Sequence, residues 1–418
     1  MFCKSLEQFL NEYLENDVPY MDLYFENKEH YKDLYDYAKQ HLYDTRFQVI
    51  MGYLYKYGEA GEKNHQLAFE HFYKAAINDN KYAANEIALA YEYGNGVDKN
   101  IEESVKWFEK GVALNNPSSM NDLGYLYERG IGVKQNLEIA VEYYQMAADL
   151  GNPTAINNLA LCYKLGKVVK QDYHKAFELF TKAAELGCNV SYSHLGYMYE
   201  QGQGTEVNLE KAFHYYEIAA KKGVPVGMFN LGFTYDHGIG TAKDPEKALY
   251  WYEESAKKGY QQGMLNAGIM YNHGIGVAQD FEKARYWYEK AAECGNARAQ
   301  CSLGFMYEKG NGVPQNYKIA LEYYEKSANS GYATAINNLG VFYEHGFGCE
   351  ANINKAIEYY KIAAEKGEGI ALSNLGLCYR YGRGVCKNVS YALELFKKAI
   401  DAGYEKAKDY YEKAKNEL

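Results

Sequence analysis

Residues 119–151 read SMNDLGYLYERGIGVKQNLEIAVEYYQMAADLG, and this stretch decides the fold. Apolar residues recur at helical spacing on both sides of the central IGVKQN, so two helices joined by a turn are expected. Gly124 lacks a side chain and lets the second helix come close, and we expect Tyr127, on the same face, to fill the groove beside it. Gly130 suits the left-handed conformation that ends a helix.

The same unit returns ten times at a spacing of 36 residues. Its most regular mark is a glycine, or an alanine in its place, which we call the repeat glycine: Gly52, Ala88, Gly124, Ala160, Gly196, Gly232, Gly268, Gly304, Gly340 and Gly376. A tyrosine follows three residues after each one. A fixed period of this length predicts stacked repeats. We therefore expect an all-α fold, an αα-superhelical solenoid of about ten 36-residue helix-turn-helix repeats.

The second helix of each unit is preceded by an asparagine or aspartate. These residues are Asn64, Asn100, Asn136, Asp172, Asn208, Asp244, Asp280, Asn316, Asn352 and Asn388. Such a side chain caps a helix by accepting a hydrogen bond from an unpaired backbone amide. The fourth unit departs from the pattern, because Val168 stands where most others have the second glycine of Gly-x-Gly. We expect its turn to differ in shape.

The period divides the chain into three segments. Residues 47–403 hold the ten repeats, and the register breaks on either side. Because the end units of a solenoid must shield its open ends, we interpret residues 1–46 as an irregular N-terminal helical cap and residues 404–418 as a C-terminal capping helix.

The motif resembles the Sel-one-like repeat (SLR) family, relatives of the 34-residue tetratricopeptide repeat. The residues that carry the resemblance are Leu231-Gly232, Tyr235, Gly238, Gly240, Lys247-Ala248, Trp251-Tyr252 and Gly259. The resemblance covers about residues 47–403. It implies an adaptor that holds other proteins together in signalling, secretion, quality control or host interaction. Secreted cysteine-rich relatives pair cysteines within each repeat, and this chain lacks that pattern.

Composition narrows the function classes. The formal net charge of −10 argues against a nucleic-acid partner, which needs a basic face. No stretch approaches 18 apolar residues, so membrane insertion is not expected. The N-terminus lacks the pattern of a signal peptide, which favours a cytoplasmic protein, with translocation by a signal-peptide-independent route as the alternative. Reduced cysteines fit that compartment, although the pairs Cys294/Cys301 and Cys378/Cys386 remain open as disulfides.

Polar residues recur two positions before the repeat glycine, on the first helix. Five of them are asparagines, Asn158, Asn230, Asn266, Asn338 and Asn374. Because an amide donates and accepts hydrogen bonds at once, a ladder of them on the concave face would suit the backbone of an extended peptide. The alternative is that each asparagine bonds a neighbouring helix.

Two further sets are candidates for partner binding. One residue after the repeat glycine lie the aromatics Tyr125, Tyr197, Phe233 and Phe305, which could anchor a partner's side chains or pack between repeats. Four residues after it lie the acids Asp236, Glu308 and Glu344. They indicate either an acidic stripe that selects a basic partner or a solvated helix face.

No catalytic motif or phosphate-binding loop occurs, so we predict no enzymatic activity, cofactor or metal. The leading hypothesis is a non-catalytic scaffold or adaptor that binds a protein or an extended peptide on its concave face. The alternative is a secreted or translocated effector or virulence-type regulator that also acts by protein binding. A remote alternative is an enzyme like those suspected among the cysteine-rich relatives.

Overall fold

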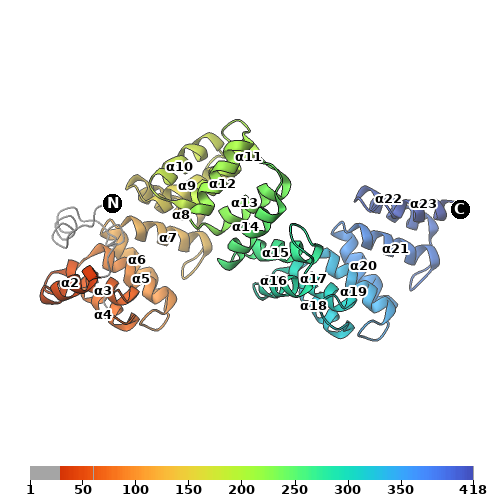
Figure 1. The fold of residues 1–418 in the computed structure, drawn as a ribbon, viewed down its shortest axis with the longest axis horizontal. Coiled ribbons are helices and arrows are strands. Elements are labelled where there is room, and N and C mark those ends of the chain that lie inside the picture. The colour runs from red at the N-terminus through yellow and green to blue at the C-terminus, as the bar shows by residue number, and fades with distance from the viewer. Residues whose placement is uncertain (1–28, 60, 418) are drawn as a thin grey trace. The chain divides into compact units, whose positions relative to one another are not determined.

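The computed structural model describes residues 29–59 and 61–417, and in this part of the chain it contains 22 helices and no strand. The predicted all-α solenoid is therefore confirmed (Figure 1). Two helices of 12 or 13 residues form each repeat. We call the first helix of a repeat the A helix and the second the B helix.

The chain divides into two compact units, one ending at Asn208 and the other beginning at Leu209. We describe each unit by itself. The A helices of unit 1 are α3 (Thr45–Tyr57), α5 (Lys81–Tyr93), α7 (Pro117–Arg129), α9 (Pro153–Leu165) and α11 (Asn189–Gln201). Its B helices are α4 (His65–Ala76), α6 (Ile101–Ala113), α8 (Leu137–Asp149) and α10 (Tyr173–Glu185), and α2 (Glu29–Gln40) precedes them.

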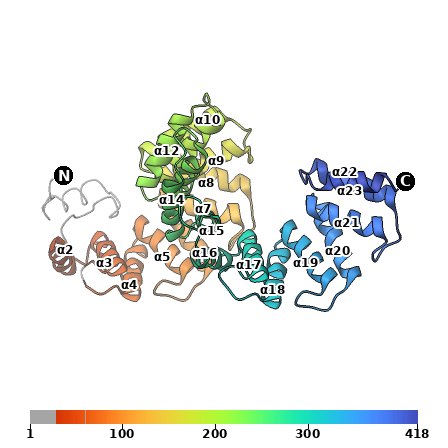
Figure 2. The same ribbon diagram turned by 45° about the vertical axis from the view of Figure 1, so that its right-hand side comes forward.

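Unit 2 continues the same alternation (Figure 2). It begins with the B helix α12 (Leu209–Lys221). Its A helices are α13 (Pro225–His237), α15 (Gln261–His273), α17 (Ala297–Lys309), α19 (Ala333–His345) and α21 (Gly369–Tyr381). Its other B helices are α14 (Pro245–Lys257), α16 (Phe281–Glu293), α18 (Tyr317–Asn329), α20 (Ile353–Glu365) and α22 (Val389–Asp401), and α23 (Ala407–Lys415) ends the unit. Within each unit every helix packs against the next one along the chain.

The helix ends follow the sequence pattern. The N-cap prediction is confirmed in nine repeats, where the side-chain oxygen accepts from a backbone N–H of the first turn: Asn64, Asn100, Asn136, Asp172, Asp244, Asp280, Asn316, Asn352 and Asn388. Gly130 ends its A helix at φ 69°, as predicted. Val168 has φ 65° and so takes the left-handed conformation that Gly132 has at φ 68°. In the same turn the Val169 N–H donates to the Lys167 carbonyl at 2.7 Å. The expectation that this turn differs in shape stays a prediction.

The space beside the repeat glycine is filled by a ring from the B helix. A Cβ atom on Gly124 would lie 3.0 Å from the ring of Tyr144, and one on Gly304 would lie 2.7 Å from the ring of Tyr324. Tyr127, which we expected in this place, is only half-buried and stacks on Tyr143. The aromatic ring that fills the gap beside the repeat glycine is therefore on the B helix, because a ring opposite the missing side chain can enter the gap between the two helices.

The predicted caps are described only in part. Residues 1–28 lie outside the described residues, and α2, in the rest of segment 1–46, packs against α3. At the other end, α23 contacts α21 and α22. The boundaries of the three segments remain a prediction.

Candidate peptide-binding surface

The A helices form one side of each unit. Those of neighbouring repeats contact each other directly, as α7 does with α9 and α19 with α21. We call the surface made by their outward side chains the A-helix face. All twelve residues predicted to bind a partner lie on A helices. Tyr125, Tyr197 and Phe305 are 41%, 39% and 45% exposed, and the other nine are half-buried.

Three of the five predicted asparagines donate a hydrogen bond to the preceding repeat. The side-chain amide of Asn158 donates to the Asn121 side-chain oxygen at 2.9 Å, and Asn374 donates to Asn337 at 3.0 Å. Asn338 reaches the sulfur of Cys301 at 3.8 Å. All three acceptors are buried. At these places the asparagine joins two neighbouring A helices, which was the alternative interpretation of the sequence.

Asn266 has different surroundings. The corresponding residue of the preceding repeat is Phe229, which offers no acceptor on its side chain. Asn266 lies near the hydroxyl of Tyr252, but that buried hydroxyl has no partner with ordinary hydrogen-bond geometry in the described part of the chain. Asn230 occupies the same position on α13 and is half-buried.

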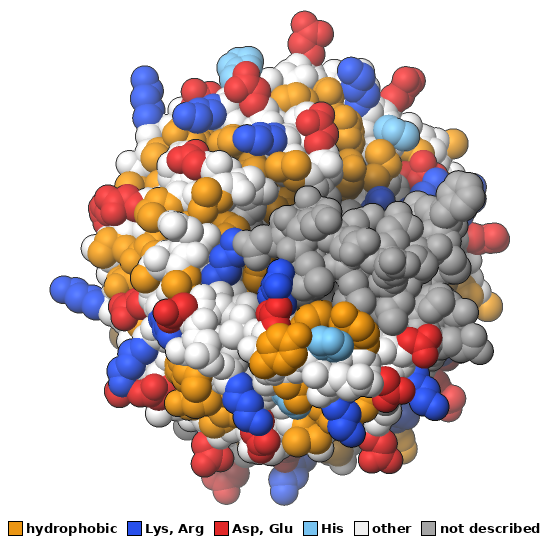
Figure 3. All heavy atoms as spheres, turned by 90° about the vertical axis from the view of Figure 1, so that its left-hand side faces the viewer, with side chains coloured by type: hydrophobic (Ala, Val, Ile, Leu, Met, Phe, Trp, Pro, Cys, Tyr) orange, Lys and Arg blue, Asp and Glu red, His pale blue; other side chains and the backbone are white. Residues whose placement is uncertain are grey.

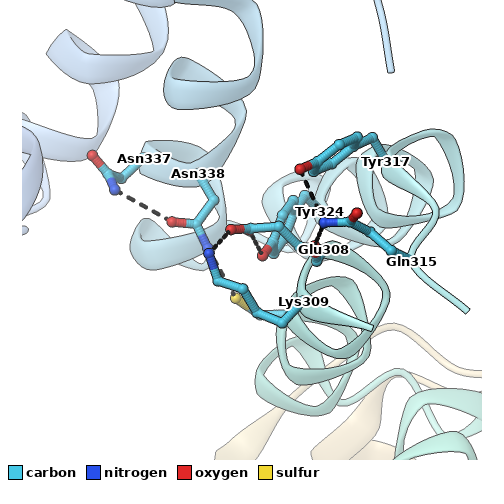
Figure 4. Close-up of polar contacts among 8 residues, drawn as sticks. Glu308, Lys309, Gln315, Tyr317, Tyr324, Asn337 and Asn338 are labelled. Atoms are coloured by element: carbon cyan, nitrogen blue, oxygen red, sulfur yellow. Dashed lines mark hydrogen bonds and ion pairs between the residues drawn. The ribbon is translucent and has the colours of Figure 1, made fainter. Parts of the chain in front are cut away.

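The predicted acids have partners within their own unit. The buried Tyr324 hydroxyl donates to Glu308 at 2.7 Å, and the buried Tyr360 hydroxyl donates to Glu344 at the same distance. Burial raises the pKa of both hydroxyls, and the adjacent carboxylate raises it further. Figure 4 shows Glu308 between Tyr324 and Lys309, whose Nζ lies 2.6 Å away.

The other carboxylates differ in detail. Glu344 also accepts a hydrogen bond from Arg383. Asp236 lies 3.8 Å from the Nδ1 atom of His237. An aspartate is one methylene shorter than a glutamate, and the tyrosine of this repeat, Tyr252, has the unpartnered hydroxyl described above.

The aromatic candidates stack with cationic or imidazole groups. Phe233 stacks on His237 with ring centroids 4.0 Å apart. Tyr125 lies 5.7 Å from the Arg129 guanidinium, Tyr197 lies 4.0 Å from the Lys164 ammonium and Phe305 lies 5.5 Å from the Lys309 ammonium. Each of these rings on the A-helix face therefore has one side against a neighbouring side chain.

A hollow of about 280 Å³ opens on the A-helix face of unit 2, across α15, α17 and α19. It brings together two of the predicted residues, Phe305 and Asn338. The rest of its lining is Ile269, Asn272, His273, Tyr288, Arg298, Cys301, Ser302, Tyr332 and Thr334. Most of these residues had not been singled out as partner-binding candidates. Those on the A helices lie three, four or seven residues apart, so helical periodicity could have found them.

A larger hollow of about 600 Å³ lies in unit 1. The starts of α5, α7 and α9 line it, and its charged residues are Lys81 and Glu86. None of the residues predicted to bind a partner lines this hollow.

Across the face drawn in Figure 3, acidic and basic side chains are interspersed with apolar ones.

Two further properties bear on what the surface can hold. Within residues 29–59 and 61–417, no three His, Cys, Asp or Glu side chains are grouped so that they could hold a metal ion. Among the helices of this part of the chain, none has the length and apolar character needed to cross a membrane.

Helix pairs of constant length, stacked through their A and B helices, define an αα-solenoid repeat protein. The model of the Sel1 repeat matches residues 46–80, 81–116, 117–152, 153–188, 190–224, 225–260, 261–296, 297–332, 333–368, 369–404 and 403–417. The chain belongs to the Sel1 repeat family, and proteins of this family generally mediate protein–protein interaction.

The solved structures that are similar to this chain include the following two. The first is c5321, a protective antigen of uropathogenic Escherichia coli strains with an SLR fold. It is 28% identical, the match covers 94% of this chain and 91% of that one, and the TM-score is 0.51. The second is a Sel1 repeat protein from Oxalobacter formigenes, 31% identical, covering 58% of this chain and 96% of that one with a TM-score of 0.52. No curated protein matches the chain.

Proposed function

We propose that the protein is a non-catalytic adaptor that binds a partner protein, through an extended segment of it, on the A-helix face. The observation that carries this proposal is the hollow of unit 2. There the 45% exposed ring of Phe305 lies beside the polar side chains of Ser302 and Asn338. An apolar anchor surrounded by donors and acceptors suits a peptide, which presents both side chains and backbone groups.

The proposal covers the remaining candidates as well. In the described part of the chain, Asn230 and Asn266 donate no hydrogen bond of ordinary geometry to a preceding A helix. Their amides therefore support peptide binding better than those of Asn158 or Asn374. Glu308 already pairs with Lys309, and Glu344 already pairs with Arg383. A basic group of a partner would bind these carboxylates in addition to those side chains. The proposal includes a cytoplasmic location for the protein.

A second candidate is an effector or virulence-type regulator that is translocated and acts by protein binding. One observation favours it: the E. coli relative, which the match covers almost completely, is described as a protective antigen. Both candidates use the same surface, so one experiment on that surface serves both.

The test is site-specific photo-crosslinking with the full chain. A photoreactive phenylalanine replaces Phe305 on the A-helix face or, as the matched control, Tyr250 on the B helix α14, which is 54% exposed. We expect partner proteins to be crosslinked from position 305 and not from position 250. Crosslinking from position 250 alone would place the binding surface on the B helices and contradict the proposal.

A further inference from the structure

The charges around the unit 2 hollow differ from those expected of a site for a basic partner. We propose that this hollow binds a peptide segment that carries a carboxylate next to a large apolar side chain. The carboxylate would pair with Arg298, and the apolar side chain would lie against Phe305 and Ile269. This inference rests on the proposed function and specifies the partner's chemistry.

Arg298 carries the charge that supports this inference. It is exposed near the start of α17, and among the lining residues it is the one arginine or lysine. The lining includes no aspartate or glutamate, and within the described part of the chain Arg298 forms no ion pair. Because a guanidinium binds a carboxylate through two parallel hydrogen bonds, an unpaired arginine in a hollow favours an acidic ligand.

The Arg298 guanidinium affects the pKa values of two buried groups that line the hollow, Tyr288 and Cys301. Burial raises the pKa of the Tyr288 hydroxyl to about 12, while the Ser302 side chain and the positive charge of Arg298 oppose the shift. Burial and the negative charges of Glu368 and Glu308 raise the pKa of the Cys301 thiol to about 12, and Arg298 opposes this shift as well. Arg298 is therefore near these two buried groups. A carboxylate bound there would be partly removed from water, which strengthens its attraction to the guanidinium.

The apolar part of the hollow adjoins this charge. Phe305 lies seven residues after Arg298 on the same helix, two turns further along α17. Ile269, at the position of Phe305 one repeat earlier, is half-buried. Exposed aromatics beside a partly desolvated charge are typical anchors of peptide interfaces.

The acidic residues next to the hollow determine on which side of it the ligand's carboxylate can bind. Glu368 accepts a hydrogen bond from Thr334 at 3.3 Å, at the side of the hollow formed by α19. Glu308 is bonded to Tyr324 and Lys309. A ligand carboxylate would be repelled near Glu368, so the Arg298 side is the favourable place for it.

The hollow of unit 1 does not share this preference. Its lining includes Glu86, whose carboxylate pairs with Lys56. At the position of Glu86 in its repeat, unit 2 has the neutral Ser302 and Asn338 in the repeats that line its hollow. The selection of an acidic segment is thus a property of unit 2.

The inference is tested by selecting binders from random peptides displayed on phage, with the full chain as bait. The variants are Arg298→Glu and, as a control with the same charge change, Lys258→Glu at the exposed end of α14. Circular dichroism and melting temperature verify that each variant is folded. The best peptide is then titrated by fluorescence polarisation.

We expect the unaltered chain to enrich peptides with Asp or Glu next to Phe, Leu or Ile. Arg298→Glu should weaken the best peptide at least about tenfold, while Lys258→Glu should leave its affinity within about twofold. Enriched peptides that lack acids, and whose binding is lost in Phe305→Ala but kept in Arg298→Glu, would overturn this inference and leave the adaptor function standing. Failure to enrich any peptide would contradict both.

Discussion

The side-chain amide of Asn374 donates a hydrogen bond to the side-chain oxygen of Asn337, one repeat earlier, at 3.0 Å. Asn158 and Asn121 are related in the same way at 2.9 Å. Asn337 is 2% exposed, so its oxygen has little access to water. These two pairs connect neighbouring A helices through polar atoms. Any role of this ladder in binding has to be separated from its part in stability.

Replacing Asn374 with alanine should lower the free energy of unfolding by about 1–3 kcal/mol, because it leaves a buried oxygen without a donor. Urea unfolding followed by circular dichroism measures the change. The double variant Asn337→Ala/Asn374→Ala should lose less than the sum of the two single losses. Unchanged stability in Asn374→Ala together with lost partner binding would show that this asparagine serves the ligand.

Two buried tyrosines offer a matched comparison. Tyr324→Phe removes a hydroxyl that donates to Glu308, and it should cost about 1–2 kcal/mol of unfolding free energy. Tyr252→Phe removes a buried hydroxyl that has no partner in the described part of the chain, so it should leave stability unchanged or raise it. Thermal unfolding of both variants checks this order. Equal losses would mean that the carboxylate contributes nothing.

Val168 is a β-branched residue with φ 65°, at a position where eight of the other nine repeats have a glycine. An L-residue in this region costs roughly 1–2 kcal/mol, and glycine avoids that cost while losing more backbone entropy on folding. Val168→Gly should therefore raise stability by about 0.5–1 kcal/mol.

The neighbouring residue provides the control. Val169 is half-buried against the core of unit 1 and is not among the residues with positive φ. Val169→Gly should lower the melting temperature, whereas Val168→Gly should raise it. A loss of stability in both variants would exclude backbone strain at position 168.

Asp122 should make the protein's stability depend on pH. Burial, together with the negative charges of Glu92 and Glu86, raises the pKa of this carboxyl to about 6, although a hydrogen bond from Asn121 opposes the shift. Because the folded pKa lies above the unfolded value of 3.8, the aspartate destabilises the fold increasingly as pH rises from about 4 to about 6. Above pH 6 the penalty is complete.

Asp122→Asn places an asparagine at the position where five other repeats already have one, namely Asn158, Asn230, Asn266, Asn338 and Asn374. The variant should be more stable than the unaltered protein at pH 7, by on the order of 2 kcal/mol. This gain should shrink below pH 6 and vanish below pH 4. Urea unfolding at several pH values measures it, and a gain that is independent of pH would exclude titration of Asp122 as the cause.

Much of the fold could be predicted because its signals are local or strictly periodic. The N-cap of a B helix needs only the asparagine or aspartate and the amides of the next turn, so Asn136 could be assigned from its position alone. The left-handed end of an A helix follows in the same way from Gly130. The φ of 65° at Val168 could not be predicted in this way, because valine carries a side chain and has no local preference for the left-handed region.

The hydrogen-bond partners of the polar side chains could not be predicted from one repeat. Whether an asparagine of the A-helix face joins two helices depends on a residue 37 positions earlier, as for Asn374 and Asn337. Likewise Glu308 looks like a solvated acid until Tyr324 of the next helix is seen to donate to it. In both cases the partner belongs to another helix, and only the packing of the two helices brings the atoms within bonding distance.

The 36-residue period by itself determined that the chain folds as stacked helix pairs, because helix spacing, caps and turns depend on neighbours within a few residues. The tertiary structure decided which side chains remain available to a partner. The hollow of unit 2 needs Ile269, Arg298 and Asn338 from three successive A helices. Residues so far apart in sequence converge only when each A helix is packed against the next repeat.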